Sequence, residues 1–382
     1  MTKRFLKVLP LAAAVLLATS CSKDNNDEKT VENQPKVEKV VIPFSVKVNT
    51  GNSISKIAYT QDGNDVSKFN VNFTDEDINT EMNIASEGNI EPSILKLDKD
   101  GDNFVFKGEI TLAKGKTEED FNNGFNITGS FGEAGTSIVT STTSLADVMS
   151  NCSHQYTSTF SSNAETINLD DNYAYLEMSC SAQQTKFQLT IGENTADYTP
   201  NANKKIWIAV PKGTQVTGNL VKTMAVEGGK VYRADRTDVV DLGPSVSVLW
   251  TLKNIGASTS TDFGNEYSWN TGVTPIPIPD GYRMPSNAEF TAMVNASTSK
   301  NWENNGRTYK NDYGSVYFRA AGHDGHQGQN YNAWYWSSDR LETWHHGWFY
   351  FDKTSTGNAG YATEGDNNNF KVPIRLVRDM QN

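Results

Sequence analysis

The sequence predicts an all-β sandwich followed by a second domain of different character. Before residue 236, short runs of alternating apolar and polar residues are separated by Gly, Asn and Asp, which is typical of strands joined by turns. After residue 240 the composition changes. All Trp residues except Trp207 lie there, and no Arg occurs between Arg4 and Arg233. These changes predict a domain boundary near residue 236.

Residues 1–20 have the pattern of a lipoprotein signal peptide. Three cations lie within the first seven positions, and the apolar stretch at 8–17 is shorter than the roughly 20 residues that a membrane-spanning helix needs. Residues 17–21 resemble a bacterial lipobox, in which the Cys is acylated and the chain is cut before it. The resemblance implies that Cys21 anchors the mature protein, since each buried methylene of an acyl chain contributes ~0.8 kcal/mol.

Residues 21–37 are predicted to form a disordered tether, because the segment after Cys21 is polar and charged and has no apolar period. Its acidic cluster at 23–28 resembles the signal that sends lipoproteins of the Bacteroidetes to the outside of the outer membrane. The resemblance implies an outer-membrane lipoprotein that faces the cell exterior. The alternative is a tether that is merely well solvated.

Residues 38–236 are predicted to form the β-sandwich, because the apolar positions recur with period two. The one good helix candidate is 144–149, with Ser144 as its N-terminal cap. The expected strands are 40–48, 54–59, 94–97, 104–110, 173–178, 187–191, 206–211 and 230–232.

One segment of this region has the spacing of a calcium loop. Asp98, Asp100, Asp102 and Glu109 match the acidic positions, but Asn103 stands where a sharp loop needs Gly. The residues that follow are apolar and alternate like a strand. A β-hairpin with an Asp-Gly turn is therefore the better prediction.

Four features together resemble the fimbrillin-like sandwiches of Bacteroidetes surface proteins: the lipobox, the tether, and the strands at 206–211 and 229–232. In that family many shaft subunits lose a first strand by cleavage after an Arg, and a partner's strand fills the groove. No Arg lies between Cys21 and Tyr232, so that cleavage cannot occur here. The resemblance then implies a tip or accessory subunit, or a lone surface protein.

Residues 237–382 resemble the Fibrobacter major paralogous domain family. That family is similar to the C-type-lectin-like fold, so the resemblance implies a compact α+β domain with long loops. Ser286 and Glu289 predict a capping box at a helix start. The matching blocks are 240–257, 263–269, 281–290, 318–322, 334–338 and 374–378.

The loops of this second domain are expected to carry the ligand. The candidate binding residues are Trp302, His323, Tyr331, Trp344 and His345, because aromatic faces suit the apolar faces of sugars. Three other Trp residues, at 250, 269 and 336, are predicted to be core. The arginines at 283 and 375 are expected either to pair with buried carboxylates or to lie at the surface.

Metal and cysteine chemistry leave alternatives open. A zinc site would use the histidines at 323, 326, 345 and 346, but histidines that make hydrogen bonds are the favoured interpretation, so we expect no metal. Calcium stays an alternative through residues 366–369, which a flexible turn explains more simply. Cys152 and Cys180 form either a disulfide or two buried free thiols, since spacing alone does not fix the geometry.

The composition narrows the function. An excess of Asp and Glu over Lys and Arg, 45 against 34, disfavours nucleic-acid binding, and the motifs of Ser hydrolases, phosphate loops and zinc proteases are missing. We therefore expect no enzyme. The leading hypothesis is a surface adhesin or a fimbrial tip or accessory subunit. Its partners would be the outer membrane through Cys21, and fimbrial subunits or surface glycans or proteins. The alternative is a lipoprotein that captures glycans for polysaccharide uptake.

Overall fold

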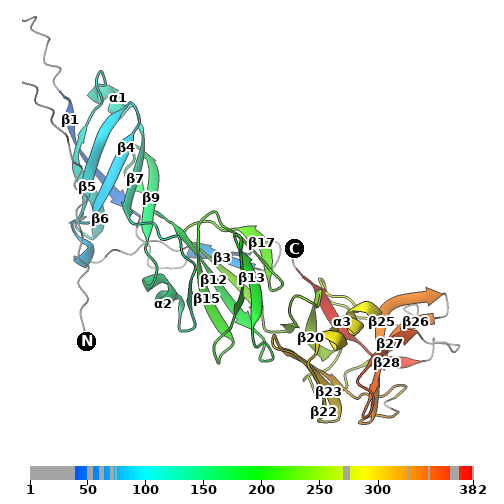
Figure 1. Ribbon diagram of the computed structural model, residues 1–382. Coiled ribbons are helices and arrows are strands. Elements are labelled where there is room, and N and C mark those ends of the chain that lie inside the picture. Colours follow the sequence, from blue (N-terminus) through cyan, green and yellow to red (C-terminus); the bar gives the residue numbers. More distant parts are fainter. Residues whose placement is uncertain are drawn as a thin grey trace, which may run out of the picture. The chain divides into compact units, whose positions relative to one another are not determined.

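The computed structural model describes most of the chain after residue 38, and strands dominate it (Figure 1). The predicted signal peptide, the tether and Cys21 lie outside the described residues. Within the described ranges, no helix has both the length and the apolar character that crossing a bilayer requires. The described residues are 39–49, 55–59, 64–68, 73, 75–269, 276–325, 327–342, 345–361 and 370–380.

An eight-stranded sheet forms the first core, in the order β10-β1-β6-β5-β4-β7-β9-β11. Alternate residues of β1 point inward, so that Ile42, Phe44, Val46 and Val48 are buried together with residues of the other strands. A short 3-10 helix η1 (Asp75–Asp77) and helix α1 (Glu118–Asn122) lie in the connections. The strands are β1 (Val41–Val48), β4 (Glu81–Ser86), β5 (Ile90–Asp100), β6 (Asn103–Thr111), β7 (Asn126–Gly132), β9 (Gln155–Ser161), β10 (Thr166–Ile167) and β11 (Asp170–Asp171).

The predicted Asp-Gly hairpin is confirmed between β5 and β6. Asp100 pairs with Asn103 across the turn, where Gly101 has a φ of 61°, a conformation that glycine adopts without strain. The Asp98 carboxylate accepts a hydrogen bond from the Lys99 backbone N–H at 2.8 Å and forms an ion pair with Lys107. This acidic side chain therefore contacts a neighbouring cation of the hairpin.

A six-stranded sheet (β2-β3-β18-β12-β15-β8) and a four-stranded sheet (β14-β13-β16-β17) enclose a second core. Leu176 and Ile208 come from the larger sheet, and Phe187, Leu189 and Val216 from the smaller one. The strands are β2 (Ser55–Tyr59), β3 (Asn64–Lys68), β8 (Val139–Ser141), β12 (Tyr173–Cys180), β13 (Phe187–Ile191), β14 (Asn194–Tyr198), β15 (Lys205–Pro211), β16 (Gln215–Gly218), β17 (Val221–Ala225) and β18 (Lys230–Arg236).

The region that the sequence suggested as one sandwich thus holds two hydrophobic cores. One draws on residues between 42 and 169, and the other on residues between 174 and 249. The physical reason is that alternation shows which side chains point inward, but not which sheet they face. The strands β2 and β3 follow β1 in the chain, yet β3 pairs with β18 of the second core.

Helix α2 (Leu145–Ser150) is confirmed as predicted, with Ser144 Oγ accepting a hydrogen bond from the Asp147 N–H at 3.0 Å. Its Val148 packs with Tyr173 and Tyr175 of β12. The helix therefore covers the outer face of the six-stranded sheet, which explains why β12 is buried on both faces.

The C-terminal region combines several small sheets with one longer helix, α3 (Asn287–Ala296). The predicted capping box is confirmed, because Ser286 Oγ accepts from the Glu289 N–H and Glu289 accepts from the Ser286 N–H. The strands are β19 (Val239–Asp241), β20 (Val248–Asn254), β21 (Glu266–Ser268), β22 (Ser299–Glu303), β23 (Gly306–Lys310), β24 (Ser315–Arg319), β25 (Asn332–Glu342), β26 (His345–Asp352), β27 (Asn358–Tyr361), β28 (Lys371–Pro373) and β29 (Arg375–Asp379).

Candidate functional site: an aromatic face on the C-terminal sheet

The sheet β25-β26-β27 presents different side chains on its two faces, because successive residues of a strand point in opposite directions. On one face Tyr335 and Phe349 are fully buried in a core that also includes Phe290 of α3. On the other face the side chains of Trp334, Trp348 and Tyr350 stay partly exposed. These three side chains are named the aromatic face.

The rings of the aromatic face contact one another across the strands. The Trp334 centroid lies 4.7 Å from that of Trp348 and 4.6 Å from that of Tyr350, with interplanar angles of 64° and 51°. Gly360 lies opposite Trp348 on β27, where a Cβ would come within 3.1 Å of the indole. The glycine leaves room for the indole, so the rings form a tilted, closely packed cluster.

A buried layer supports these rings from behind. Trp336 is fully buried, and its Nε1–H donates to the Tyr267 carbonyl at 2.7 Å. Phe370 lies 5.8 Å from Trp336 and 6.1 Å from Trp334, ring centre to ring centre. Because the supporting rings are packed and hydrogen-bonded, the aromatic face is held in place before any ligand arrives.

A carboxylate at the edge of the aromatic face is fully engaged within the protein. Asp352 accepts hydrogen bonds from the Tyr350 hydroxyl at 2.7 Å, the Thr354 N–H and hydroxyl at 2.6 and 2.7 Å, and the Ser355 N–H at 2.6 Å. The bond from Tyr350 is the main reason why the pKa of Asp352 lies far below its usual value. Burial, followed by the bond to Asp352, raises the pKa of Tyr350 to about 12. The tyrosine is therefore neutral at physiological pH.

Two of the residues suggested by the sequence border the aromatic face. Tyr331 is 54% exposed and directly precedes β25, and its carbonyl accepts a hydrogen bond from the Lys353 N–H at 3.1 Å, next to Asp352. The His323 ring lies 5.1 Å from Phe370, which in turn contacts Trp334.

The remaining suggested residues do not join them in the described structure. Trp302 packs against Phe351, a core residue on the opposite face of the sheet, and its ring lies 5.6 Å from the Arg307 guanidinium. Trp344 lies outside the described residues. His345 begins β26, and only its backbone is described.

The sequence reasoning missed the aromatic face as a site. Trp334 was read only as part of a family block, and Trp348 and Tyr350 were not singled out as ligand contacts. The available signal was the run of aromatic residues at both odd and even positions of 334–336 and 348–351. Such a run places large rings on both faces of a strand, and only one face can point into a core.

Among the described residues, no group of three or more His, Cys, Asp and Glu side chains is arranged to hold a metal ion. His323 contacts the Asp324 carboxylate at 3.2 Å, and His346 is buried with its ring stacked 4.0 Å from Trp269. His326 and the calcium candidate at 366–369 lie outside the described residues.

The two cysteines carry free thiols, so the disulfide alternative is wrong. Cys152 packs beneath α2, whereas Cys180 belongs to the second core between the two sheets. Burial raises the pKa of the Cys152 thiol to about 11 and that of Cys180 to about 12. Both thiols are therefore protonated and weakly reactive at neutral pH.

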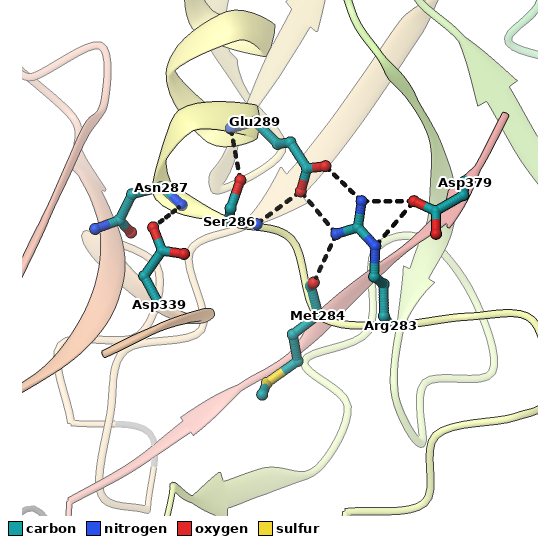
Figure 2. A network of polar contacts seen from close by, with 7 residues as sticks. All are labelled: Arg283, Met284, Ser286, Asn287, Glu289, Asp339 and Asp379. Atoms are coloured by element: carbon teal, nitrogen blue, oxygen red, sulfur yellow. Dashed lines mark hydrogen bonds and ion pairs between the residues drawn. The ribbon is translucent and has the colours of Figure 1, made fainter. Parts of the chain in front are cut away.

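Arg283 pairs with carboxylates, as one of the two expectations held. Figure 2 shows its guanidinium between Glu289 and Asp379. The Nη1 and Nη2 atoms donate to the two Glu289 oxygens at 2.9 and 2.5 Å, and Nε and Nη2 donate to Asp379 Oδ1 at 2.9 and 2.6 Å. This network ties the start of α3 to the last strand, β29, and so stabilises the frame behind the aromatic face.

Arg375 is fully buried, but neither expectation for it held. Its Nε donates to Asn254 Oδ1 at 2.9 Å, and its Nη atoms donate to the Thr251 and Tyr317 carbonyls at 2.9 and 3.0 Å. The guanidinium also lies 4.6 Å from the Phe318 ring centre. All of these printed acceptors are uncharged.

A cavity of about 520 Å³ lies beside β20, away from the aromatic face. Its walls are mainly apolar, with Ile255, Pro279 and Leu376 among them. Asp238 is the single carboxylate among its described lining residues, and it accepts a hydrogen bond from the Tyr282 hydroxyl. The cavity therefore lacks the pair of carboxylates that acid–base hydrolysis of a glycoside uses.

Comparison with protein-family models, with curated proteins and with solved structures found no match.

Proposed function

We propose that this chain is a non-catalytic cell-surface adhesin, anchored through lipidated Cys21, and that the aromatic face binds carbohydrate. The observation that carries the proposal is the set of partly exposed rings at Trp334, Trp348 and Tyr350 on a rigid sheet. The C–H groups on the face of a sugar ring carry a small positive charge, and the face of an aromatic ring carries a small negative one. Such rings therefore favour sugars.

Neutral hydrogen-bonding groups beside the rings support a carbohydrate ligand. Asn332 and Asn358 stand at the ends of β25 and β27, and Asn358 lies opposite Tyr350 in the sheet. Sugar hydroxyls both donate and accept hydrogen bonds, which suits amide side chains. A purely apolar partner would gain nothing from these groups.

The finer fold assignment belongs to the same proposal. We assign residues 38–236 to a fimbrillin-like region and residues 237–382 to a C-type-lectin-like domain. The two β cores support the first assignment, and α3 with its capping box among small sheets supports the second. The first region would act as a stalk for the second.

The sheet edges favour a tip subunit or a lone surface protein over a shaft subunit. Strand donation needs a long open edge with unpaired N–H and C=O groups. The eight-stranded sheet ends in β10 and β11, which are two residues each in the described structure. Together with the missing Arg before residue 233, these short edges make surface glycans better candidate partners than fimbrial subunits.

A glycan-capture lipoprotein of a polysaccharide-uptake system is the second candidate, and the same aromatic face favours it. The two functions differ in their ligand. An adhesin binds glycans that are fixed to another cell, whereas a capture protein binds soluble polysaccharide that is then imported. Cell attachment by the purified chain would support the first, and binding of free polysaccharide without attachment would support the second.

A glycan array probed with the mature chain tests the proposal. We expect selective binding that falls about tenfold in Trp334→Ala or Tyr350→Ala, because one stacked ring contributes ~1–2 kcal/mol. Chelation of calcium should leave binding unchanged, since the Asp352 oxygens are already hydrogen-bonded within the protein.

The matched control is Trp302→Ala, which removes an aromatic ring from the opposite face of the sheet. It should keep its glycan binding if it folds, as judged by circular dichroism. Absence of any bound glycan, or equal loss in Trp302→Ala and Trp334→Ala, would contradict the proposal.

A further inference from the structure

An acid–base pair lies where the first core meets the cluster beneath α2. His154 follows α2 and directly precedes β9, whereas Asp171 ends β11. The Asp171 side chain is 1% exposed and that of His154 is 19% exposed. The proposed carbohydrate site plays no part here.

The contacts of the imidazole define its protonation. Nε2 lies 2.8 Å from the Met149 carbonyl oxygen, which can only accept, so this nitrogen carries a hydrogen. Nδ1 lies 3.0 Å from both oxygens of Asp171. A neutral ring has only one N–H, so it would turn a lone pair of Nδ1 toward the carboxylate. The geometry therefore fits the doubly protonated ring.

Asp171 is arranged as an ionised acceptor. Besides His154, it accepts a hydrogen bond from the Tyr175 hydroxyl at 2.8 Å and from the Tyr173 N–H at 3.2 Å. A buried carboxylate with several donors keeps its charge because each donor stabilises it. The pair is thus a cation and an anion with nearly all of their polar atoms engaged.

The pair joins two separate hydrophobic clusters. The His154 ring stacks on Tyr156 at 5.5 Å, and Tyr156 packs against the first core. The same ring lies 6.0 Å from Tyr173, which belongs to the cluster beneath α2. A change in the charge of His154 would therefore act on both clusters at once.

Few other charges face this pair. Burial raises the pKa of Tyr156, Tyr173 and Tyr175, and it raises that of Cys152 to about 11, so these four groups are uncharged at neutral pH. Asp77 acts on Tyr156 from η1. Burial lowers the pKa of His154, but its bonds to Asp171 and Met149 outweigh burial and raise the pKa overall.

We propose that His154 and Asp171 form a proton-operated latch between the first core and the cluster beneath α2. The latch is closed while the imidazole carries both protons. When Nδ1 loses its proton to solvent, the ion pair is lost and a lone pair faces the carboxylate. The contact then weakens, and the two clusters are held less tightly.

The direction of the pH effect follows from the raised pKa. A histidine that is protonated more readily in the folded chain stabilises that chain fully below about pH 6.5, its unfolded value. This contribution is lost as the pH rises through the higher pKa of the folded state. The latch is therefore closed in mildly acidic solution and opens toward alkaline pH.

NMR of the mature chain tests the latch directly. Long-range ¹H–¹⁵N spectra resolve the ring nitrogens of the five histidines, and His154→Gln assigns the signal of interest. We expect two ring N–H groups at pH 6 and a titration midpoint above 6.5. A ring with a single N–H at pH 6, or a midpoint at or below 6.5, would overturn the latch.

Urea denaturation between pH 6 and 9 gives the second measurement. The midpoint of the wild type should fall as the pH rises, and its advantage over His154→Gln should shrink. His323→Gln, at an exposed loop histidine, should follow the wild type. If His154→Gln does not fold, Asp171→Asn tests the same contact. Equal pH dependence in the wild type and the latch variant would refute the proposal.

Discussion

Two buried cations of this protein, His154 and Arg375, are stabilised in opposite ways. His154 faces an ionised carboxylate and can lose its charge near neutral pH. Arg375 is fully buried and donates to an amide and two carbonyls. Burial lowers the pKa of Arg375 to about 10, so it stays charged at neutral pH. The comparison shows that one cation can be switched by protons, whereas the other is a permanent part of the frame.

The position of Arg375 explains why it needs no carboxylate. It sits on β29 and contacts residues of β20 and β24, which belong to two different sheets. Carbonyl dipoles and the face of Phe318 share its positive charge. Since no anion has to be buried with it, the desolvation cost is that of one ion instead of two.

Arg375→Leu breaks the permanent side of the comparison and should have the largest effect. It leaves three buried acceptors unpaired, at ~1 kcal/mol or more each, so we expect a loss of about 3 kcal/mol. The loss should be the same at pH 6 and pH 8, as measured by urea denaturation. Arg378→Leu, on the same strand but partly exposed, is the control and should cost about 1 kcal/mol or less. A loss that depended on pH in this range would contradict the fixed role.

Arg283→Ala tests a cation that is paired but not fully buried. We expect a loss of about 1–2 kcal/mol, because charged hydrogen bonds to Glu289 disappear but solvent screens part of the effect. Asp379→Asn should lose less, since Asp379 is 69% exposed.

The acid side of the same pair should respond to pH in the sense opposite to the latch. Burial raises the pKa of Glu289, but the bonds from Arg283 and Ser286 outweigh burial and lower it overall. Its contribution is present above the ordinary carboxyl pKa and is lost as the pH falls through the folded value. The wild type and Arg283→Ala should therefore converge in acid. A difference in their unfolding free energies that stayed constant from pH 7 to pH 3 would count against this pairing.

Ser286→Ala measures an uncharged contact at the same helix start and should have the smallest effect. Loss of the cap to the Glu289 N–H should cost about 1 kcal/mol at any pH. Thr291→Ala, in the exposed interior of the same helix, should be nearly neutral. Thermal unfolding of the two variants provides the check, and equal melting temperatures would mean that the cap contributes little.

Local features were the most predictable from the sequence. The caps at Ser144 and Ser286 and the turn at Gly101 were foreseen because each depends on a few neighbouring residues. The two cores were not foreseen, because their separation depends on which strands pair far apart in the chain. The same holds for Arg375, whose charge is visible in the sequence but whose neighbours are not.

The candidate site was predicted only at its border. Tyr331 and His323 lie there, but Trp302 faces the other side of the sheet. Loop position and residue type suggested all three equally. The strand register that decides which ring faces solvent is set by pairing between β25 and β26, and no single segment encodes it.

The crossing of β2 and β3 limits how this protein can be divided. The hairpin lies between β1 and β4 in the chain, yet β3 pairs with β18, more than 150 positions later. A fragment that ended after β11 would carry the hairpin without its partner strand, and a fragment that began at β12 would expose the edge of β18. The two cores are therefore interlocked in the chain, and neither can be copied, exchanged or inherited as a separate cassette.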